Sequence, residues 1–128
     1  MNDLKISLPS GTAAFEPGAE IEVDVEWSCD RPLDAVQVRL VWSTAGKGDT
    51  DIKVAKTVQI RQPDQSGSQR LMIVLPWGPY SFSGKLISIL WGLELIVFPS
   101  EASTRTEITI APGGKEVRLQ STAAEDDL

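Results

Sequence analysis

The sequence contains no histidine and only one cysteine, Cys29, among its 128 residues. Catalysis by a Ser-His-Asp or a Cys-His arrangement is therefore excluded. Zinc sites built from histidine or from several thiolates are excluded for the same reason. Chemistry based on carboxylates, lysine, tyrosine or a serine–lysine pair stays open, as does calcium binding through oxygen atoms.

Basic residues are also few. Twelve Lys and Arg stand against 18 Asp and Glu, which gives a net charge of −6 and a pI near 4.6. Nucleic-acid binding needs a basic face, so nucleic acid is excluded as the main partner. Docking on an anionic membrane is disfavoured on the same grounds.

Three features that mark exported or membrane proteins are missing. One cysteine cannot form an internal disulfide, which favours the reducing cytoplasm as the location. The start of the chain, MNDLKISLPSG, lacks the basic and apolar regions of a signal peptide. The longest apolar run, Leu86 to Phe98, is too short to span a bilayer.

The dominant pattern is an alternation of apolar and polar residues, which predicts strands with one buried face. In one segment four apolar residues alternate with an acidic stripe of Glu20, Glu22, Asp24 and Glu26. The inward sets that we predict for three strands are Ile21, Val23, Val25 and Trp27; Val36, Val38, Leu40 and Trp42; and Ile52, Val54, Val58 and Ile60. Lys56 interrupts the third set, so we predict a β-bulge there. Ile108 and Ile110 face inward near the end.

Two segments, Leu71–Leu75 and Ile87–Val97, are apolar on both faces. Such segments are typical of central strands in a sandwich. In the second segment one parity is predicted to lie in the core. The apolar residues of the other parity then need another surface to bury them, and a partner or a second copy of the chain could supply it. These residues are Leu86, Leu90, Ile96 and Phe98.

Turn residues separate the strands. Glu16–Glu20 reads EPGAE, with Pro followed by Gly as a type II turn prefers. With a short strand at Leu4–Leu8 and no helical period, we predict about seven strands in an all-β, immunoglobulin-like antiparallel sandwich. Residues 1–119 form one domain in this prediction, ending in a short strand at Glu116–Leu119, and 120–128 form a flexible acidic tail.

The middle of the chain carries three short motifs one after another. Leu75-Pro76 closes a strand, PYSFSG follows at Pro79–Gly84, and ILWGLEL follows at Ile89–Leu95. This order resembles that of the arrestin-like β-sandwich family, in which Leu-Pro is followed by a Pro-x-Ser-x-x-Gly crossing and an Ile-x-(Tyr/Trp)-x-Leu strand. FEPGAEIEVDVEW, Phe15–Trp27, resembles the family's aromatic-x-Pro-Gly turn before a long strand.

The resemblance covers roughly Leu4 to Ile110 and implies an arrestin-like sandwich with an adaptor or scaffold role and no catalysis. Arrestins carry two such sandwiches, whereas this chain has room for one. The sequence has no Pro-Pro-x-Tyr motif, because Tyr80 follows Gly-Pro. Receptor binding and ubiquitin-ligase recruitment are therefore not implied.

The crossing segment holds the strongest candidate site. It contains Trp77, Pro79, Tyr80 and Phe82. One interpretation is a structural corner whose aromatic rings plug one end of the sandwich. The other is an exposed aromatic tip that binds a partner, since Trp and Tyr anchor interfaces out of proportion to their number. We expect Trp77 to be the most exposed of the four, because it lies between Pro76 and Gly78.

Other candidates have a structural and a functional interpretation each. The loop aspartates either favour turns or bind calcium; they are Asp30, Asp34, Asp49, Asp51 and Asp64. The acidic stripe is either a solvated face or a docking face for a basic partner. Glu94 interrupts an apolar strand, and its parity places it on the outside. Cys29 is expected to be a small buried filler, and Trp27, Trp42 and Trp91 to pack in the core.

The sequence therefore predicts a non-catalytic protein-interaction or scaffold module without metal or cofactor. It would bind a protein or peptide, or a second copy of itself, at an edge strand or at loop tips. The alternative is a calcium-dependent sandwich module that binds a membrane or a ligand. A carboxylate-based enzyme is a third hypothesis, and it would need a concave pocket lined by two acids.

Overall fold

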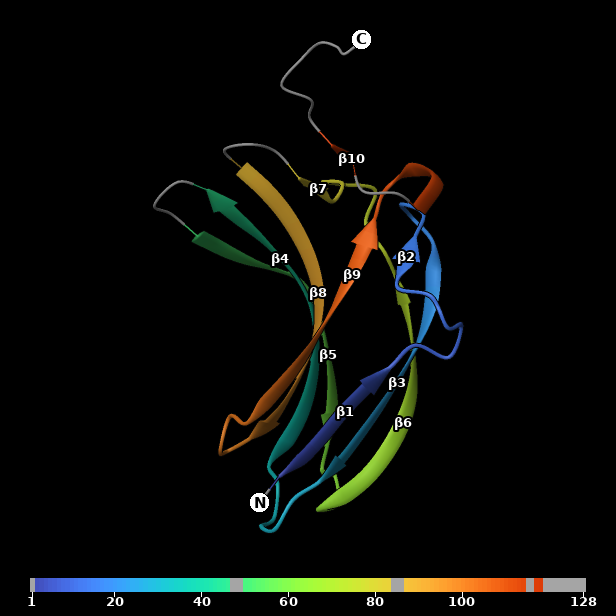
Figure 1. The fold of residues 1–128 in the computed structure, drawn as a ribbon. Coiled ribbons are helices and arrows are strands. Elements are labelled where there is room, and N and C mark those ends of the chain that lie inside the picture. Colours follow the sequence, from blue (N-terminus) through green and yellow to red (C-terminus); the bar gives the residue numbers. More distant parts are fainter. Residues whose placement is uncertain (1, 47–49, 84–86, 115–116, 119–128) are drawn as a thin grey trace, which may run out of the picture.

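The computed structural model describes residues 2–46, 50–83, 87–114 and 117–118 (Figure 1). The predicted tail, 120–128, lies outside these residues, as do Glu116 and Leu119 at the ends of the predicted last strand. The strands are β1 (Asp3–Ser7), β2 (Ala14–Phe15), β3 (Glu20–Ser28), β4 (Ala35–Gly46), β5 (Thr50–Arg61), β6 (Ser66–Val74), β7 (Phe82–Ser83), β8 (Ile87–Phe98), β9 (Ser103–Ile110) and β10 (Val117–Arg118), with a 3₁₀ turn at Pro112–Gly114.

The prediction of an all-β sandwich is confirmed. Seven of the described strands have five residues or more, and they form two packed sheets (Figure 1). One sheet has the order β1-β3-β6. The other runs β10-β7-β8-β4-β5, and β9 pairs with β8. The long strands pair antiparallel, but the short pairs β2–β9 and β10–β7 are parallel.

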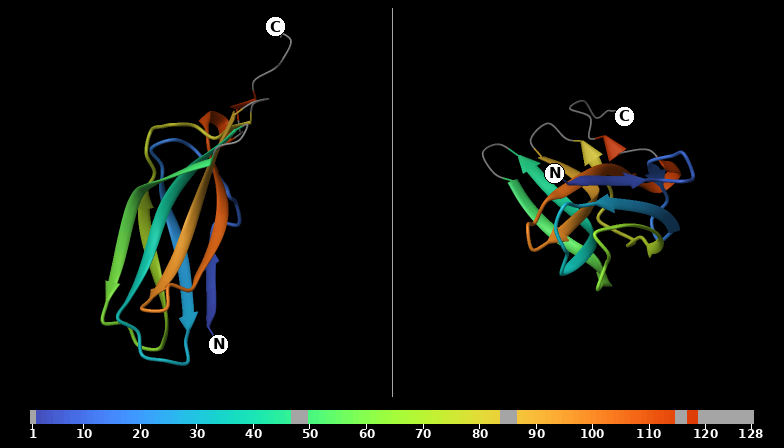
Figure 2. Two further views of the ribbon diagram at one scale, coloured as in Figure 1. Left: turned by 90° about the vertical axis from the view of Figure 1, so that its left-hand side faces the viewer. Right: turned by 90° about the horizontal axis from the view of Figure 1, so that it is seen from below.

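The core lies between the two sheets. Trp91, Leu93 and Leu95 of β8 are 0% exposed. They face Val23 and Val25 of β3, which are also fully buried within the same cluster. Figure 2 shows the sandwich elongated along its strands. In Figure 1 the upper ends of β4, β5 and β8 diverge from β2 and β3. Among the described residues, no helix has the length and apolar character needed to cross a membrane.

The predicted bulge near Lys56 is confirmed, but its consequence for Ile52 and Val54 was predicted wrongly. Leu40 pairs with Lys56 and the next residue, Val41, pairs with Val54, so Ala55 is the extra residue. The extra residue reverses the parity of the strand beyond it. Ile52 and Val54 are consequently 61% and 51% exposed rather than buried.

The apolar segments at Leu71–Leu75 and Ile87–Val97 occupy different places. The second forms the central part of β8, as predicted, between β4 and β9. The first belongs to β6, which is an edge strand and not a central one. On the outer face of β8, Ile96 is 7% exposed, so it is covered within the chain, whereas Leu86 lies outside the described residues.

The predicted type II turn is present at Glu16–Ala19. The N–H of Ala19 donates to the C=O of Glu16 at 3.2 Å. Gly18, the third residue of the turn, has φ +76°, which is the conformation that a type II turn requires there. The turn delivers the chain into β3.

Candidate functional site

The corner from Leu75 to Ser81 is attached to the sandwich at its beginning by main-chain hydrogen bonds. The N–H of Leu75 donates to the C=O of Ala19 at 2.8 Å, and the N–H of Gly18 donates to the C=O of Pro76 at 3.2 Å. Both bonds join the corner to the type II turn that precedes β3. The backbone before Trp77 is therefore fixed.

The corner is attached at its end as well. The N–H of Ser81 donates to the C=O of Ile110 at 2.8 Å, and the Ser81 hydroxyl accepts the N–H of Ile110 at 3.0 Å. The indole N–H of Trp91 donates to the C=O of Pro79 at 2.8 Å. Ser81 is only 2% exposed, so its polar groups are buried and paired, as buried polar groups require.

The aromatic side chains of this fixed corner face solvent. Trp77 is 77% exposed and Tyr80 is 42% exposed. Pro79 is half-buried, and the side chain of Phe82 lies outside the described part of the structure. The interpretation in which these rings plug the end of the sandwich is wrong for Trp77 and Tyr80, and the expected exposure of Trp77 is confirmed.

The Trp77 ring packs directly against the backbone of Gly18. A β-carbon on Gly18 would lie 2.6 Å from ring atoms Cε2 and Cζ2 of Trp77, too close for a real contact. Glycine therefore serves twice at this position, because it also adopts the positive φ of the turn. The indole therefore contacts the turn at Gly18, and most of its surface is exposed to solvent.

The acidic stripe lies on the outer face of the three-stranded sheet, as its parity predicted. Glu20, Glu22 and Glu26 are exposed. Asp24 accepts two hydrogen bonds from Arg70, from Nε at 2.8 Å and from Nη2 at 3.0 Å. These bonds to Arg70 lower the pKa of the Asp24 carboxyl below its usual value. The stripe is thus partly neutralised at Asp24.

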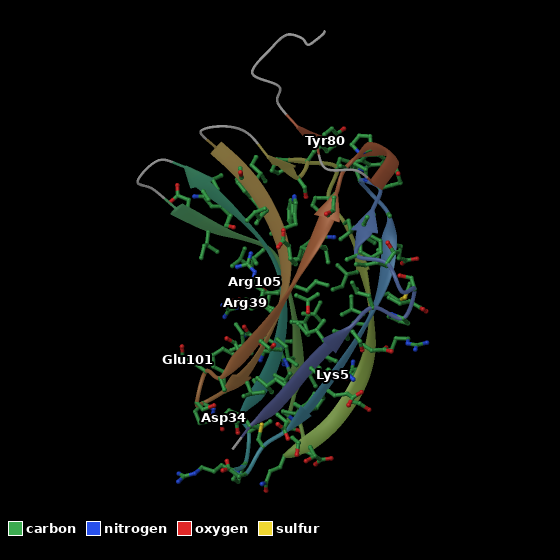
Figure 3. All side chains as sticks on the ribbon, viewed as in Figure 1. Lys5, Asp34, Arg39, Tyr80, Glu101 and Arg105 are labelled. Carbon is green, nitrogen blue, oxygen red and sulfur yellow. The ribbon has the colours of Figure 1, made fainter. Side chains whose placement is uncertain are left out.

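The aspartates that the calcium-binding alternative would use do not form a metal site among the described residues. In the β4–β5 ladder, Asp51 pairs with Thr44 near one end, whereas Ala35, the neighbour of Asp34, pairs with Arg61 at the other. In Figure 3, Asp34 lies at the end of the molecule opposite to the aromatic corner, whose position is marked by Tyr80. Asp49 lies outside the described residues. Among the residues described, no three acidic, cysteine or histidine side chains gather as metal ligands would.

Glu94 lies on the outer face of the large sheet, as its parity predicted. It pairs with Arg39 of β4 on one side and Arg105 of β9 on the other, and Figure 3 shows both arginines on this sheet. The guanidinium of Arg105 also covers Gly92, where a β-carbon would lie 2.6 Å from its Nε. The residues paired with Glu94 on both neighbouring strands are therefore arginines. These pairs do not provide the second carboxylate that a catalytic pocket with two acids would need.

The predicted core positions of Cys29 and of three tryptophans, Trp27, Trp42 and Trp91, are confirmed. Trp27 and Trp91 are 6% and 0% exposed, and Trp42 packs on the core with its ring 6.3 Å from that of Trp91. Cys29 is buried. Burial, and then the nearby charge of Asp30, raise the pKa of its thiol, so the reactive thiolate form is suppressed.

Sequence reasoning missed an exposed strip on β6 beside the corner. Met72 and Val74 are 52% and 47% exposed on the outer face. The Lys56 amine reaches across from β5 and donates to the C=O of Val74. The signal was present in the apolar pattern of Leu71–Leu75, but it was attributed to burial on both faces.

Comparison with known proteins gives a fold. No protein-family model matches the chain, and no curated protein matches its sequence. The structure is similar to the sporulation control protein Spo0M from Bacillus subtilis, with a TM-score of 0.62 and 14% identity over 86% of this chain. The match covers 49% of the Spo0M chain, so this chain spans about half the length of that protein.

A second similarity, to a β-glucosidase from Listeria innocua, has a TM-score of 0.49 and 13% identity. It covers 87% of this chain but only 16% of the enzyme, and at this TM-score it carries no argument. The two-sheet, all-β structure and the similarity to Spo0M agree, and the chain is an all-β sandwich with an arrestin-like fold.

Proposed function

We propose that the chain is a non-catalytic interaction module that docks a protein or peptide partner through Trp77 and Tyr80. The observation that carries the proposal is the combination of a solvent-facing indole, 77% exposed, with a backbone held at both ends. Exposing an indole ring to water is unfavourable by itself. A partner that covers the ring recovers that free energy without first having to order the loop.

The chemistry of the corner also favours a protein surface as the ligand. Trp and Tyr combine a large apolar area with a polar group at the edge, and they dominate the binding energy of many interfaces. The corner and the two residues after it, Leu75 to Ser83, also contain no charged residue. We therefore expect an apolar contact rather than one driven by salt bridges.

Quantitative capture from a lysate of the source cells tests the proposal. Immobilised wild-type protein is compared with Trp77→Ala and with the control Ile52→Ala, an apolar side chain 61% exposed on the other sheet. Loss of a hot-spot residue costs about 2 kcal/mol or more, roughly 30-fold in affinity. Partners of the corner should be lost with Trp77→Ala and retained with Ile52→Ala.

If both variants and the wild type capture the same proteins in the same amounts, the corner is not the docking site. Thermal unfolding of each variant provides the structural control. An exposed side chain away from special features contributes within about 0.5 kcal/mol. A large drop in the melting temperature of Trp77→Ala would mean that lost folding, rather than a lost contact, explains the result.

A further inference from the structure

The two sides of the sandwich differ in how their strand edges are covered. At one side β1 lies beside β9 of the opposite sheet. At the other side β6 pairs only with β3, within the described residues, and β5 pairs only with β4. Strand β6 is thus a nine-residue edge whose second side is unpaired. Unpaired edges are the sites at which further strands add.

Hydrogen bonds at the two ends of the β3–β6 ladder show which main-chain groups face outward. The N–H of Leu75 donates to Ala19, and the C=O of Gln65 accepts from Cys29. Odd-numbered residues of this strand therefore direct their N–H and C=O groups toward β3. Because these directions alternate along a strand, the even-numbered residues direct theirs toward the free edge.

Lys56 confirms this direction at Val74. Its amine donates to the C=O of Val74 from outside the sheet. The carbonyl of an even-numbered residue is therefore an accessible acceptor on the free edge. Lys56 occupies the last acceptor of the edge, and the groups of Ser68, Arg70 and Met72 precede it. Within the described residues, no strand pairs with them.

The same edge carries two apolar side chains toward its Val74 end, beside acids of β3, and Arg70 on its outer face forms an ion pair with Glu22, Nη1 to Oε1 at 4.0 Å. Met72 and Val74 are about half exposed on the outer face. Glu22 pairs with Met72 and Glu20 pairs with Val74 on the neighbouring strand β3. A strand added to β6 would lie about 10 Å from β3, two strand spacings away. Lysine and arginine side chains are long enough to reach the two glutamates from there, passing over apolar neighbours.

We infer that β6 accepts an extended basic segment of a partner as an additional strand, with apolar residues alternating with lysine or arginine. Main-chain hydrogen bonds to Ser68, Arg70 and Met72 provide the affinity. The basic side chains lie on the outer face, where they are attracted by Glu20 and by Glu22, whose exposed side chain is only in part neutralised by Arg70, and the apolar ones lie on the opposite face of the added strand. The inference rests on the proposed interaction function and gives it a partner of stated chemistry.

A defined peptide tests the inference. The probe is an eight-residue peptide, capped at both ends, in which valine alternates with lysine, and binding is followed by fluorescence anisotropy. The control peptide has glutamate in place of lysine. The lysine peptide should bind and the glutamate peptide should not. Equal binding of the two, or no binding of the lysine peptide, would overturn the inference.

Methylation of main-chain nitrogens separates strand addition from simple charge attraction. In an added strand, only alternate N–H groups of the peptide face β6. Methylating the valine nitrogens in one peptide and the lysine nitrogens in another should therefore abolish binding for one of the two and spare the other. If both methylated peptides bind alike, the main chain does not carry the recognition and strand addition is wrong.

Variants of the protein locate the site. Ser68→Pro removes an N–H that faces the free edge and leaves the ladder with β3 intact, as edge prolines do. It should abolish binding, while the melting temperature verifies folding. The double change Glu20→Lys and Glu22→Lys, which keeps the edge, should weaken the lysine peptide by about tenfold or more. If both variants bind the lysine peptide with the affinity of the wild type, the peptide binds at another site and the inference is wrong.

The outcome is separable from that of the proposed function. Trp77→Ala tests the corner, whereas Ser68→Pro tests the edge; Ser68 lies near the start of β6 and Trp77 lies beyond its end. If captured partners depend on Trp77 and the peptide is indifferent to Ser68→Pro, the corner function holds and the inference fails. Peptide-free protein that sediments as a dimer disrupted by Ser68→Pro would assign the edge to a second copy, and would also overturn it.

Discussion

Trp77 and Trp91 are separated by a short segment of chain, yet their indole rings occupy opposite environments. Trp91 is fully buried in the central strand β8, whereas Trp77 is 77% exposed at the corner. The two are linked, since the Trp91 indole donates to Pro79 within the corner. The buried Trp91 ring thus holds the backbone of the corner, and the corner presents the exposed Trp77 ring.

The largest expected effect is that of Trp91 on stability. Trp91→Ala should lower the free energy of unfolding by about 3–5 kcal/mol, because it leaves a large cavity. Trp91→Phe keeps an aromatic ring but leaves the C=O of Pro79 without its donor, and about 1–3 kcal/mol should be lost. Urea denaturation measures both. A Trp91→Phe variant as stable as the wild type would show that this bond does not hold the corner.

The next effect concerns the support of Trp77. Gly18→Ala should destabilise the protein by about 1–2 kcal/mol, since a non-glycine residue is strained at positive φ, and it should also displace the Trp77 ring. Gly11→Ala is the matched control, because Gly11 has φ +75° with open space around it. Only Gly18→Ala should shift the indole N–H resonance of Trp77 in a ¹⁵N–¹H spectrum. Equal shifts in both variants would contradict the contact.

A smaller effect involves the pair of Asp24 and Arg70. The pKa of Asp24 is lowered by its hydrogen bonds to Arg70, so the pair stabilises the fold above the unfolded pKa of about 3.9. This contribution is lost as the pH falls through the lower pKa of the folded state. Arg70→Gln should therefore lower the melting temperature slightly at neutral pH and not at all in strong acid. A difference independent of pH would contradict it.

The smallest expected effect is that of calcium. Asp51 lies at the opposite end of the β4–β5 ladder from Asp34, and among the described residues no three acidic side chains gather as metal ligands, whereas calcium takes six to eight oxygen ligands in one place. We therefore expect the same melting temperature in calcium and in EDTA. A calcium-dependent rise in the melting temperature would restore the calcium-binding alternative and would weaken the emphasis on the corner.

Patterns with a local physical cause were predictable from the sequence. The alternation in β3 and β4 specified one buried face for each, and the Pro-Gly pair specified the turn at Glu16–Ala19. The exposure of Trp77 followed from its position between Pro76 and Gly78, which cannot continue a strand. The positions of Trp27, Trp91 and Cys29 followed from apolar neighbours of the same parity.

Features that depend on which strands become neighbours were not predictable. Ala55 reverses the parity of the upper part of β5, and its position depends on pairing with β4. The segment Leu71–Leu75 is as apolar as a central strand, yet it lies at an edge, since no strand in the described part of the chain pairs with the outer side of β6.

Local sequence patterns thus determined the strands, their buried faces and the turn that supports the corner, because each depends on the chemistry of neighbouring residues. Pairing across the fold determined the rest. It joined Lys56 to Val74, placed Gly18 against Trp77, and, among the described residues, left one side of β6 unpaired. These contacts connect residues far apart in the chain, so they exist only once the two sheets have packed against each other.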